Sequence, residues 1–130
     1  MVLQQLHRQW WSPDRLARLQ QRRLITLVRH AYEQVPHYRR CFEKVGLNPY
    51  DFHGIEDLQR IPITHKADLL HLNVPDIMAQ NATIDQLKQH TTGGTTGVPV
   101  AIFSPPYVEN KRVASLMATF IVNGYRPHEK

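Results

Sequence analysis

Cysteine is scarce and long apolar runs are missing in this chain of 130 residues. Its single cysteine, Cys41, cannot form an internal disulfide, which is typical of a protein kept in a reducing compartment. No apolar stretch is long enough to span a bilayer, so we expect no membrane partner. The segment from Met1 to Trp11 lacks the apolar centre of a secretory signal. These absences together predict a cytoplasmic location.

Motifs of several catalytic classes are also missing. No serine stands in a G-x-S-x-G pattern, so a hydrolase of that kind is not supported. The eight histidines are not spaced four residues apart on one helix face and have no cysteine partners. We therefore expect scattered surface histidines, no metal site, and no catalytic residue that the sequence alone could assign.

The charge is moderately basic, with a formal net charge of +5 and a pI near 9.7. Such values invite a nucleic-acid interpretation, but the arginines are scattered along one predicted helix, where a solvated face explains them. The hydrophobic fraction of 42% and the charged fraction of 21% are those of a globular domain. We expect no nucleic-acid partner.

The N-terminal part of the chain is predicted to be helical. Ser12 and Pro13 make a strong helix start, with serine at the N-cap and proline in the first turn. Apolar residues then recur at helical spacing, which predicts a helix from about 13 to 34 that stops before Pro36. A shorter helix is expected from about 37 to 45.

Two short features near these helices carry their own expectations. Trp10 and Trp11, just before the first helix, are expected to fold back onto the core as a hydrophobic staple. Cys41 lies on the apolar face of the second helix and has no activating partner in the sequence, so we expect a buried small hydrophobic residue.

The middle of the chain predicts only short elements. One helical turn is expected at 55–58 and an extended stretch at 61–63. Thr64 can cap a helix over about 65–72. The residues from 75 to 82 are expected to be irregular or weakly helical.

Two strands and one long helix complete the pattern. We expect strands at 83–90 and at 100–103, joined by a segment rich in glycine and threonine. Ser104 and Pro105 repeat the helix-start signal, and the helix is expected to end before Gly124. Two strands make a marginal sheet with exposed edges.

This order predicts an incomplete α/β fold over residues 1–130. A mostly helical lead-in spans 1–82, and a strand–loop–strand hairpin followed by a long helix spans 83–130. The chain therefore reads as the opening of a larger α/β domain.

The segment Thr91–Pro99 is the strongest chemical signal. Its glycines allow close approach of the backbone to a ligand, and successive N–H groups in such a turn can form an anion nest to which threonine hydroxyls add donors. A plain turn between two strands explains the same residues equally well. Gly97 is followed by Val98 rather than lysine, so the segment is not a Walker A loop, and the dinucleotide fingerprint is absent.

The stretch from Thr92 to Pro99 resembles the [TS]-[SG]-G-[ST]-T-G-x-P motif of the adenylate-forming superfamily, which contains the acyl-CoA synthetases. Residues 30–39 and 61–69 look like the corresponding stretches of the phenylacetate–CoA ligase group, and Gly124–Pro127 resembles its G-x-x-P segment. The opening Trp10–Pro13 and the Thr-Gly-Gly form of the loop resemble the CapK-like branch, associated with capsular or exopolysaccharide gene clusters.

The resemblance implies an enzyme that uses ATP and Mg²⁺ to convert a carboxylate into an acyl-adenylate, and then passes the acyl group to coenzyme A or another acceptor. It implies the start of the large N-terminal domain of such enzymes. The residues implied to hold the β- and γ-phosphates are Thr92, Gly93, Gly94, Thr95, Thr96 and Gly97. Many members have lysine where Val98 stands, so one phosphate-binding cation is missing.

Three hypotheses follow for the function. In the first, the chain is the N-terminal part of such a ligase and is inactive alone, because it ends before the remaining motifs of the family. In the second, it is a subunit of a split ligase that a partner chain completes in trans. In the third, it is a non-catalytic interaction module that uses its basic helical face.

Overall fold

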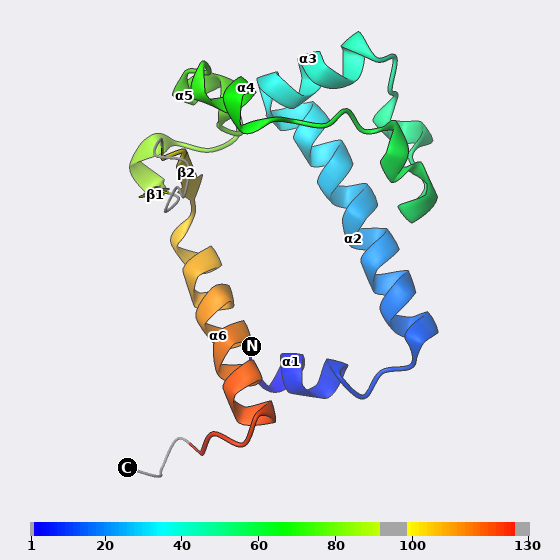
Figure 1. The fold of residues 1–130 in the computed structure, drawn as a ribbon, viewed down its shortest axis with the longest axis vertical. Coiled ribbons are helices and arrows are strands. Elements are labelled where there is room, and N and C mark those ends of the chain that lie inside the picture. The colour runs from blue at the N-terminus through cyan, green and yellow to red at the C-terminus, as the bar shows by residue number, and fades with distance from the viewer. Residues whose placement is uncertain (1, 92–98, 127–130) are drawn as a thin grey trace.

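The computed structural model describes residues 2–91 and 99–126. Two long helices run along opposite sides of the molecule, with a short helix across one end and the smaller elements across the other (Figure 1). The described elements, in order, are α1 Val2–Arg8, α2 Pro13–Gln34, α3 Pro36–Lys44, η1 Pro49–Asp51, η2 Ile55–Arg60, α4 Lys66–Leu70, α5 Val74–Ile77, η3 Ile84–Gln86, β1 Lys88–Thr91, β2 Ala101–Ser104 and α6 Pro106–Val122.

The first two predicted helices are confirmed. Helix α2 begins at Pro13, after an extended Ser12, and ends at Gln34. Val35 is both the C-cap of α2 and the N-cap of α3. Its backbone is extended because the following Pro36 disfavours the α region at this position. Helix α3 begins at Pro36, one residue before the predicted start, since proline fits the first helical position.

The core lies where α2, α3 and the following loop meet. Val28, Phe42, Leu47 and Phe52 form one buried cluster, and the Phe52 side chain is 0% exposed. Partly buried side chains pack around this cluster, namely Leu24, Ile25, Tyr32, Cys41 and Ile61. Burying a side chain of this size stabilises the fold by about 2–3 kcal/mol, so this small cluster organises the helical lead-in.

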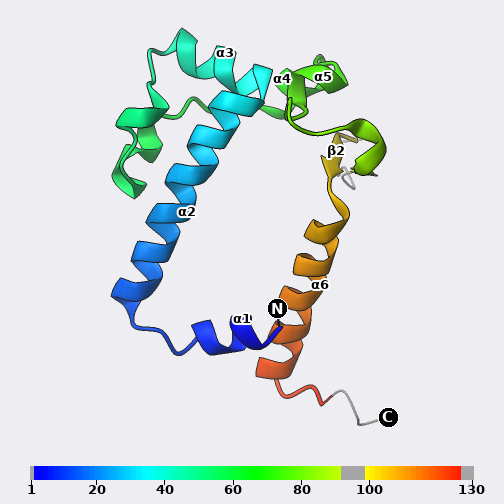
Figure 2. The same ribbon diagram turned by 180° about the vertical axis from the view of Figure 1, so that it is seen from behind.

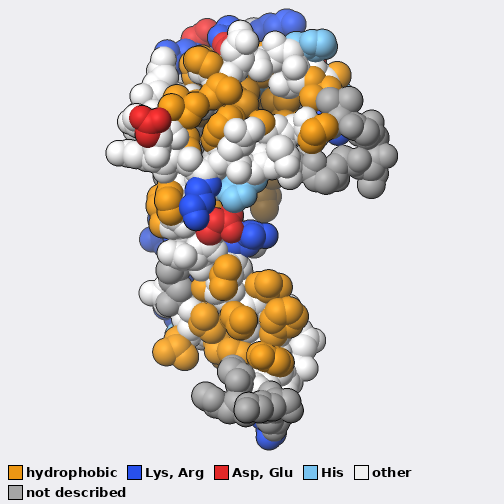
Figure 3. Space-filling view, turned by 90° about the vertical axis from the view of Figure 1, so that its left-hand side faces the viewer, with side chains coloured by type: hydrophobic (Ala, Val, Ile, Leu, Met, Phe, Trp, Pro, Cys, Tyr) orange, Lys and Arg blue, Asp and Glu red, His pale blue; other side chains and the backbone are white. Residues whose placement is uncertain are grey.

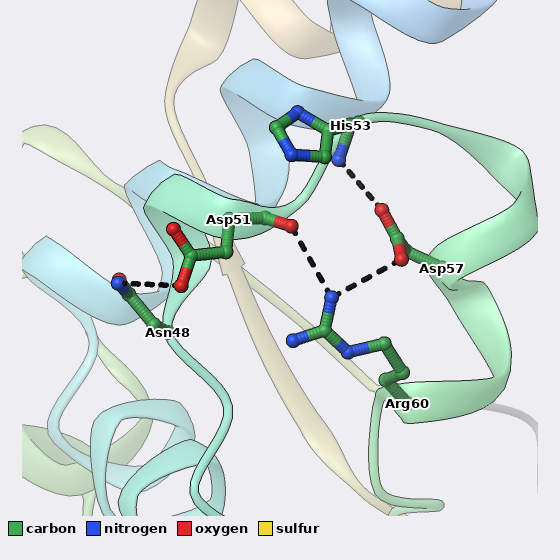
Figure 4. Close-up of polar contacts among 5 residues, drawn as sticks. All are labelled: Asn48, Asp51, His53, Asp57 and Arg60. Carbon is green, nitrogen blue, oxygen red and sulfur yellow. Dashed lines mark hydrogen bonds and ion pairs between the residues drawn. The ribbon is translucent and has the colours of Figure 1, made fainter.

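Polar contacts hold the loop that places Phe52 in the core. The Asp57 carboxylate accepts a hydrogen bond of 2.7 Å from the His53 backbone N–H (Figure 4). Arg60 donates to the other Asp57 oxygen at 3.1 Å and to the Asp51 carbonyl at 3.2 Å. These bonds cross-link η1 to η2 and satisfy backbone groups that the turn leaves free.

The N-terminal segment differs from the prediction. Residues Val2–Arg8 form α1, a helix that was not predicted from the sequence. This helix lies against the C-terminal half of α6 (Figures 1 and 2). Trp10 is 83% exposed, so the predicted staple is wrong. Trp11 instead lies under the Arg15 guanidinium, 3.7 Å from the ring centroid.

Several predicted boundaries in the second half are also wrong. His65, not Thr64, precedes α4, and its N–H donates to the Asp68 carboxylate at 2.8 Å. The strand predicted at 83–90 begins only at Lys88, because residues 84–86 close a 3-10 turn. Pro105, not Ser104, precedes α6, since Ser104 is the last residue of β2.

Helix α6 packs against α1 through small residues. Ala114 and Ala118 are buried on α6, and the Gln5 side chain of α1 donates to the Ser115 hydroxyl at 3.3 Å. Gly124 closes the helix at φ +90°, a conformation that other residues rarely adopt. Among residues 2–91 and 99–126, no helix has the length and apolarity that crossing a bilayer requires.

Candidate functional site

The hairpin that flanks the glycine–threonine segment is the first candidate. Strands β1 and β2 are antiparallel, with Thr91 opposite Ala101 and Lys88 opposite Ser104. The prediction that two strands flank the glycine–threonine segment is therefore confirmed. The residues predicted to bind phosphate, from Thr92 to Gly97, lie outside the described residues.

A charged group lies directly beside this hairpin. The Glu109 carboxylate in α6 accepts two bonds from the Arg112 guanidinium, at 2.9 and 3.2 Å. Its other oxygen is 3.4 Å from Nε2 of His90, the third residue of β1. His90 Nε2 is buried, and this approach is an ion-pair distance without hydrogen-bond geometry. The group therefore couples the hairpin to α6 electrostatically when the imidazole is protonated.

This group was not predicted from the sequence. The spacing of three residues between Glu109 and Arg112 is a recognisable helical pair. The contact with His90 joins two residues far apart in the sequence, and no local pattern could have predicted it.

A cavity of about 580 Å³ opens between the hairpin, α3 and α5. Its size is within the range of small-molecule sites. Its walls are mostly apolar, and imidazoles of His30 and His37 lie among them; the other lining residues include Tyr38, Leu69, Ile77, Met78, Leu87, Ile102, Phe103 and Tyr107. The cavity can hold an apolar group, and it separates the helical lead-in from the hairpin.

Cys41 packs against the core as expected, but it is half-buried rather than buried. The structure also places its Sγ 3.7 Å from Nε2 of His37, one helical turn earlier on α3. His37 is buried, with 8% of its surface exposed. The sequence analysis found no partner for this thiol, although a spacing of four residues on one helix is the signal that would have found it.

The described groups whose pKa is clearly shifted lie away from the hairpin. The His53 N–H, and then Arg60, lower the pKa of Asp57. The Arg40 guanidinium, 2.6 Å away, lowers the pKa of Asp76. Donation to the Glu33 carboxylate raises the pKa of Tyr50. These shifts reflect surface contacts that tie helices and loops together.

The resemblance implies Mg²⁺, whose ligands this chain could supply. The described part of the chain contains no group of three or more His, Cys, Asp or Glu side chains that could hold a metal ion. Oxygen-rich ligand sets are what Mg²⁺ prefers. Mg²⁺ bound to a nucleotide is usually held by one or two carboxylates together with the phosphates and water, so it does not require such a cluster.

Comparison with known proteins adds an independent finding. A stretch of 91 residues is 42% identical to a phenylacetate-coenzyme A ligase of Aromatoleum evansii and covers 70% of this chain. The chain is similar to phenylacetate-coenzyme A ligases. The ligases of Thermus thermophilus and Escherichia coli are 39% and 40% identical over 68% and 70% of this chain.

The chain spans about one fifth of the length of the relatives it matches, since the matched stretches cover 20–21% of the three ligases. No protein-family model matches the chain. The described residues form a mostly helical arrangement with a two-stranded antiparallel sheet and a C-terminal helix, which is consistent with part of an α/β fold.

Proposed function

We propose that the chain contributes the phosphate-binding hairpin of an ATP-dependent ligase that activates a carboxylate. The reaction would join the carboxylate to the α-phosphate of ATP, release pyrophosphate, and transfer the acyl group to coenzyme A. The observation that carries this proposal is the 37–42% identity to phenylacetate-coenzyme A ligases over about 70% of the chain.

The role proposed for the chain's own residues is positioning and charge stabilisation. Strands β1 and β2 pair up to Thr91 and Ala101, so the ends of the glycine–threonine segment are held at a fixed separation. Backbone N–H groups and the hydroxyls of Thr92, Thr95 and Thr96 would donate to the β- and γ-phosphates. Nucleotide, Mg²⁺, carboxylate and coenzyme A belong to the complete ligase in this proposal.

The surface of α6 supports a need for further protein. Leu116 is 52% exposed and Phe120 is 44% exposed, and hydrophobic side chains gather over this helix (Figure 3). The two-stranded sheet of the described residues has no further strand on either edge. We therefore propose that the rest of the ligase, in the same polypeptide or as a partner chain in trans, covers these surfaces, and that the 130-residue polypeptide alone is inactive.

Two finer features belong to the same proposal. The Trp10–Pro13 opening and the Thr-Gly-Gly form of the segment favour the CapK-like branch and a link to capsular or exopolysaccharide synthesis. A cytoplasmic location fits the supply of ATP and coenzyme A and the single cysteine, Cys41.

A chimera tests the proposal. The chain's matching stretch replaces the corresponding stretch of the Escherichia coli ligase, and phenylacetate-dependent pyrophosphate release is measured. We expect the chimera to turn over. Thr95→Val with Thr96→Val should lower kcat/KM by about a hundredfold or more, because each lost hydrogen bond to a charged group costs about 1.5–3 kcal/mol.

Thr83→Val is the matched control, because Thr83 is exposed and its side chain makes no cap hydrogen bond. Unchanged activity in the doubly substituted chimera would rule out the phosphate-binding role of the hydroxyls. Turnover by the 130-residue polypeptide alone would contradict the need for a further part. Co-purification of a larger chain that restores ATP binding would support completion in trans.

A further inference from the structure

The net charge of the chain is concentrated at one end. Residues 1–32 contain six arginines, no lysine and one acidic residue, Asp14. Residues 33–130 contain ten basic and ten acidic residues. The first 32 residues therefore carry the whole formal charge of +5, and the surface formed by α1 and the first half of α2 is strongly basic.

Three of these arginines line one shallow groove along α2. The groove has a volume of about 490 Å³ and is formed by Trp11, Arg15, Arg18, Gln21, Arg22 and Ile25. All three arginines are exposed, and none forms an ion pair with an acidic group among the described residues. Unpaired guanidinium groups in a concave surface favour an anionic ligand.

The spacing of the groove residues indicates the shape of that ligand. Trp11, Arg15, Arg18, Arg22 and Ile25 follow one another at intervals of four, three, four and three residues. This alternation keeps side chains in one line along a helix and is the spacing of a seam between two packed helices. Successive arginines lie about 4.5 or 6 Å apart along the axis, which matches carboxylates at the same intervals on a second helix.

Nucleic acid and membrane fit the groove less well. The Trp11 ring is covered by Arg15 at 3.7 Å, and its Nε1 donates to His7 at 3.0 Å. Arg15 therefore covers part of the one aromatic ring in the groove lining, and the groove lacks the row of aromatic faces on which successive bases stack. A planar bilayer surface would not fill a hollow, whereas the side chains of a second helix would.

We infer that the groove between Trp11 and Ile25 docks an acidic helical segment of a partner protein. Glutamate or aspartate side chains at alternating intervals of three and four residues would pair with Arg15, Arg18 and Arg22. An apolar side chain at each end would contact the Trp11 ring and Ile25. No described helix of this chain carries acidic residues at those intervals. The inference does not depend on the proposed ligase activity.

Fluorescence anisotropy with the full chain tests this inference. The probe is a labelled helical peptide of about 20 residues with glutamates at the alternating intervals, compared with a scrambled peptide of identical composition. We expect the patterned peptide to bind about tenfold tighter than the scrambled one, and binding to weaken between about 50 mM and about 200 mM salt. Equal affinity for the two peptides would contradict recognition of a helix through the alternating spacing of its acidic residues.

Variants matched in net charge distinguish binding in the groove from general electrostatic attraction to the chain. Arg15→Glu, Arg18→Glu and Arg22→Glu together should lower affinity for the patterned peptide about tenfold or more. The neutral Gln triple variant should lower it less, and it keeps the test valid if charge reversal unfolds α2. The control carries Arg23→Glu, Lys44→Glu and Lys111→Glu, which change net charge equally outside the groove.

Competitors decide the class of partner. A single-stranded RNA and a vesicle rich in anionic lipid are titrated against the labelled peptide complex. We expect neither to bind the chain as tightly as the patterned peptide. If either competitor bound more tightly than the patterned peptide and lost this affinity in the groove variant, the partner would be that competitor's class and not an acidic helix. An equal loss of affinity in the groove variant and the control variant would overturn the groove itself.

Discussion

At the scale of single residues, the ionised Asp57 carboxylate holds the loop that places Phe52 in the core. Its carboxylate accepts from the His53 N–H and from Arg60, and the folded protein therefore favours its ionised form (Figure 4). These bonds lower the pKa of Asp57 below its ordinary value of about 4. A depressed carboxyl pKa stabilises the fold above the ordinary pKa, and this stabilisation is lost as pH falls through the folded pKa.

We expect Asp57→Asn to lower the Tm at neutral pH, because the amide loses the charge that pairs with Arg60. The difference from the parent chain should shrink below about pH 4 as the parent carboxylate is protonated. Thermal melts followed by circular dichroism over that range measure both effects. Glu56→Gln is the control, since Glu56 has no ion pair among the described residues. A difference in Tm that is constant with pH would contradict the role of the charge.

At the scale of elements, the contact between α1 and α6 depends on small side chains. Helix α1 has seven residues and no buried residue, so it is too short to be stable without a partner. Ala118 is buried on α6 and lines a pocket between the two helices together with Gln5 and Leu6 of α1.

Ala118→Glu is expected to detach α1 while leaving the core between α2 and α3 intact, because a buried unpaired carboxylate costs several kcal/mol. Amide hydrogen exchange should show a loss of protection in α1 of about tenfold or more, with little change around Phe42. Val113→Glu is the control, since Val113 is exposed on the same helix. Equal protection of α1 in both variants would contradict the packing role of Ala118.

At the scale of the whole molecule, α6 exposes much of its apolar surface (Figure 3). The small cluster around Phe52 lies at the other end of the molecule, so α6 does not contribute to it. Apolar surface of this kind promotes association with a second protein or with other copies of the chain.

We expect the isolated chain to associate with increasing concentration, and Leu116→Lys with Phe120→Lys to shift it toward monomer. Analytical ultracentrifugation measures the shift, and binding of a hydrophobic dye should fall with it. The control carries Leu27→Lys and Ile63→Lys, which remove exposed apolar side chains elsewhere. A parent chain that stays monodisperse at high concentration and unfolds cooperatively would contradict an uncovered α6 surface.

The sequence by itself determined the features that depend on neighbouring residues. Ser12 and Pro13 set the start of α2, and Pro36 separated it from α3, because proline constrains its own backbone and that of the residue before it. The glycine–threonine segment predicted a bend between two strands, and the flanking register agrees with it. Its phosphate-binding residues remain a prediction from resemblance.

Only the tertiary structure decided the features that join distant residues. The contact of His90 with Glu109, the docking of α1 on α6, and the exposure of Trp10 follow from how elements pack. No local pattern encodes these contacts, because burial and pairing depend on which surfaces meet after the chain has folded. The sequence showed the chemistry that each segment offers, and packing decided which of its groups face one another.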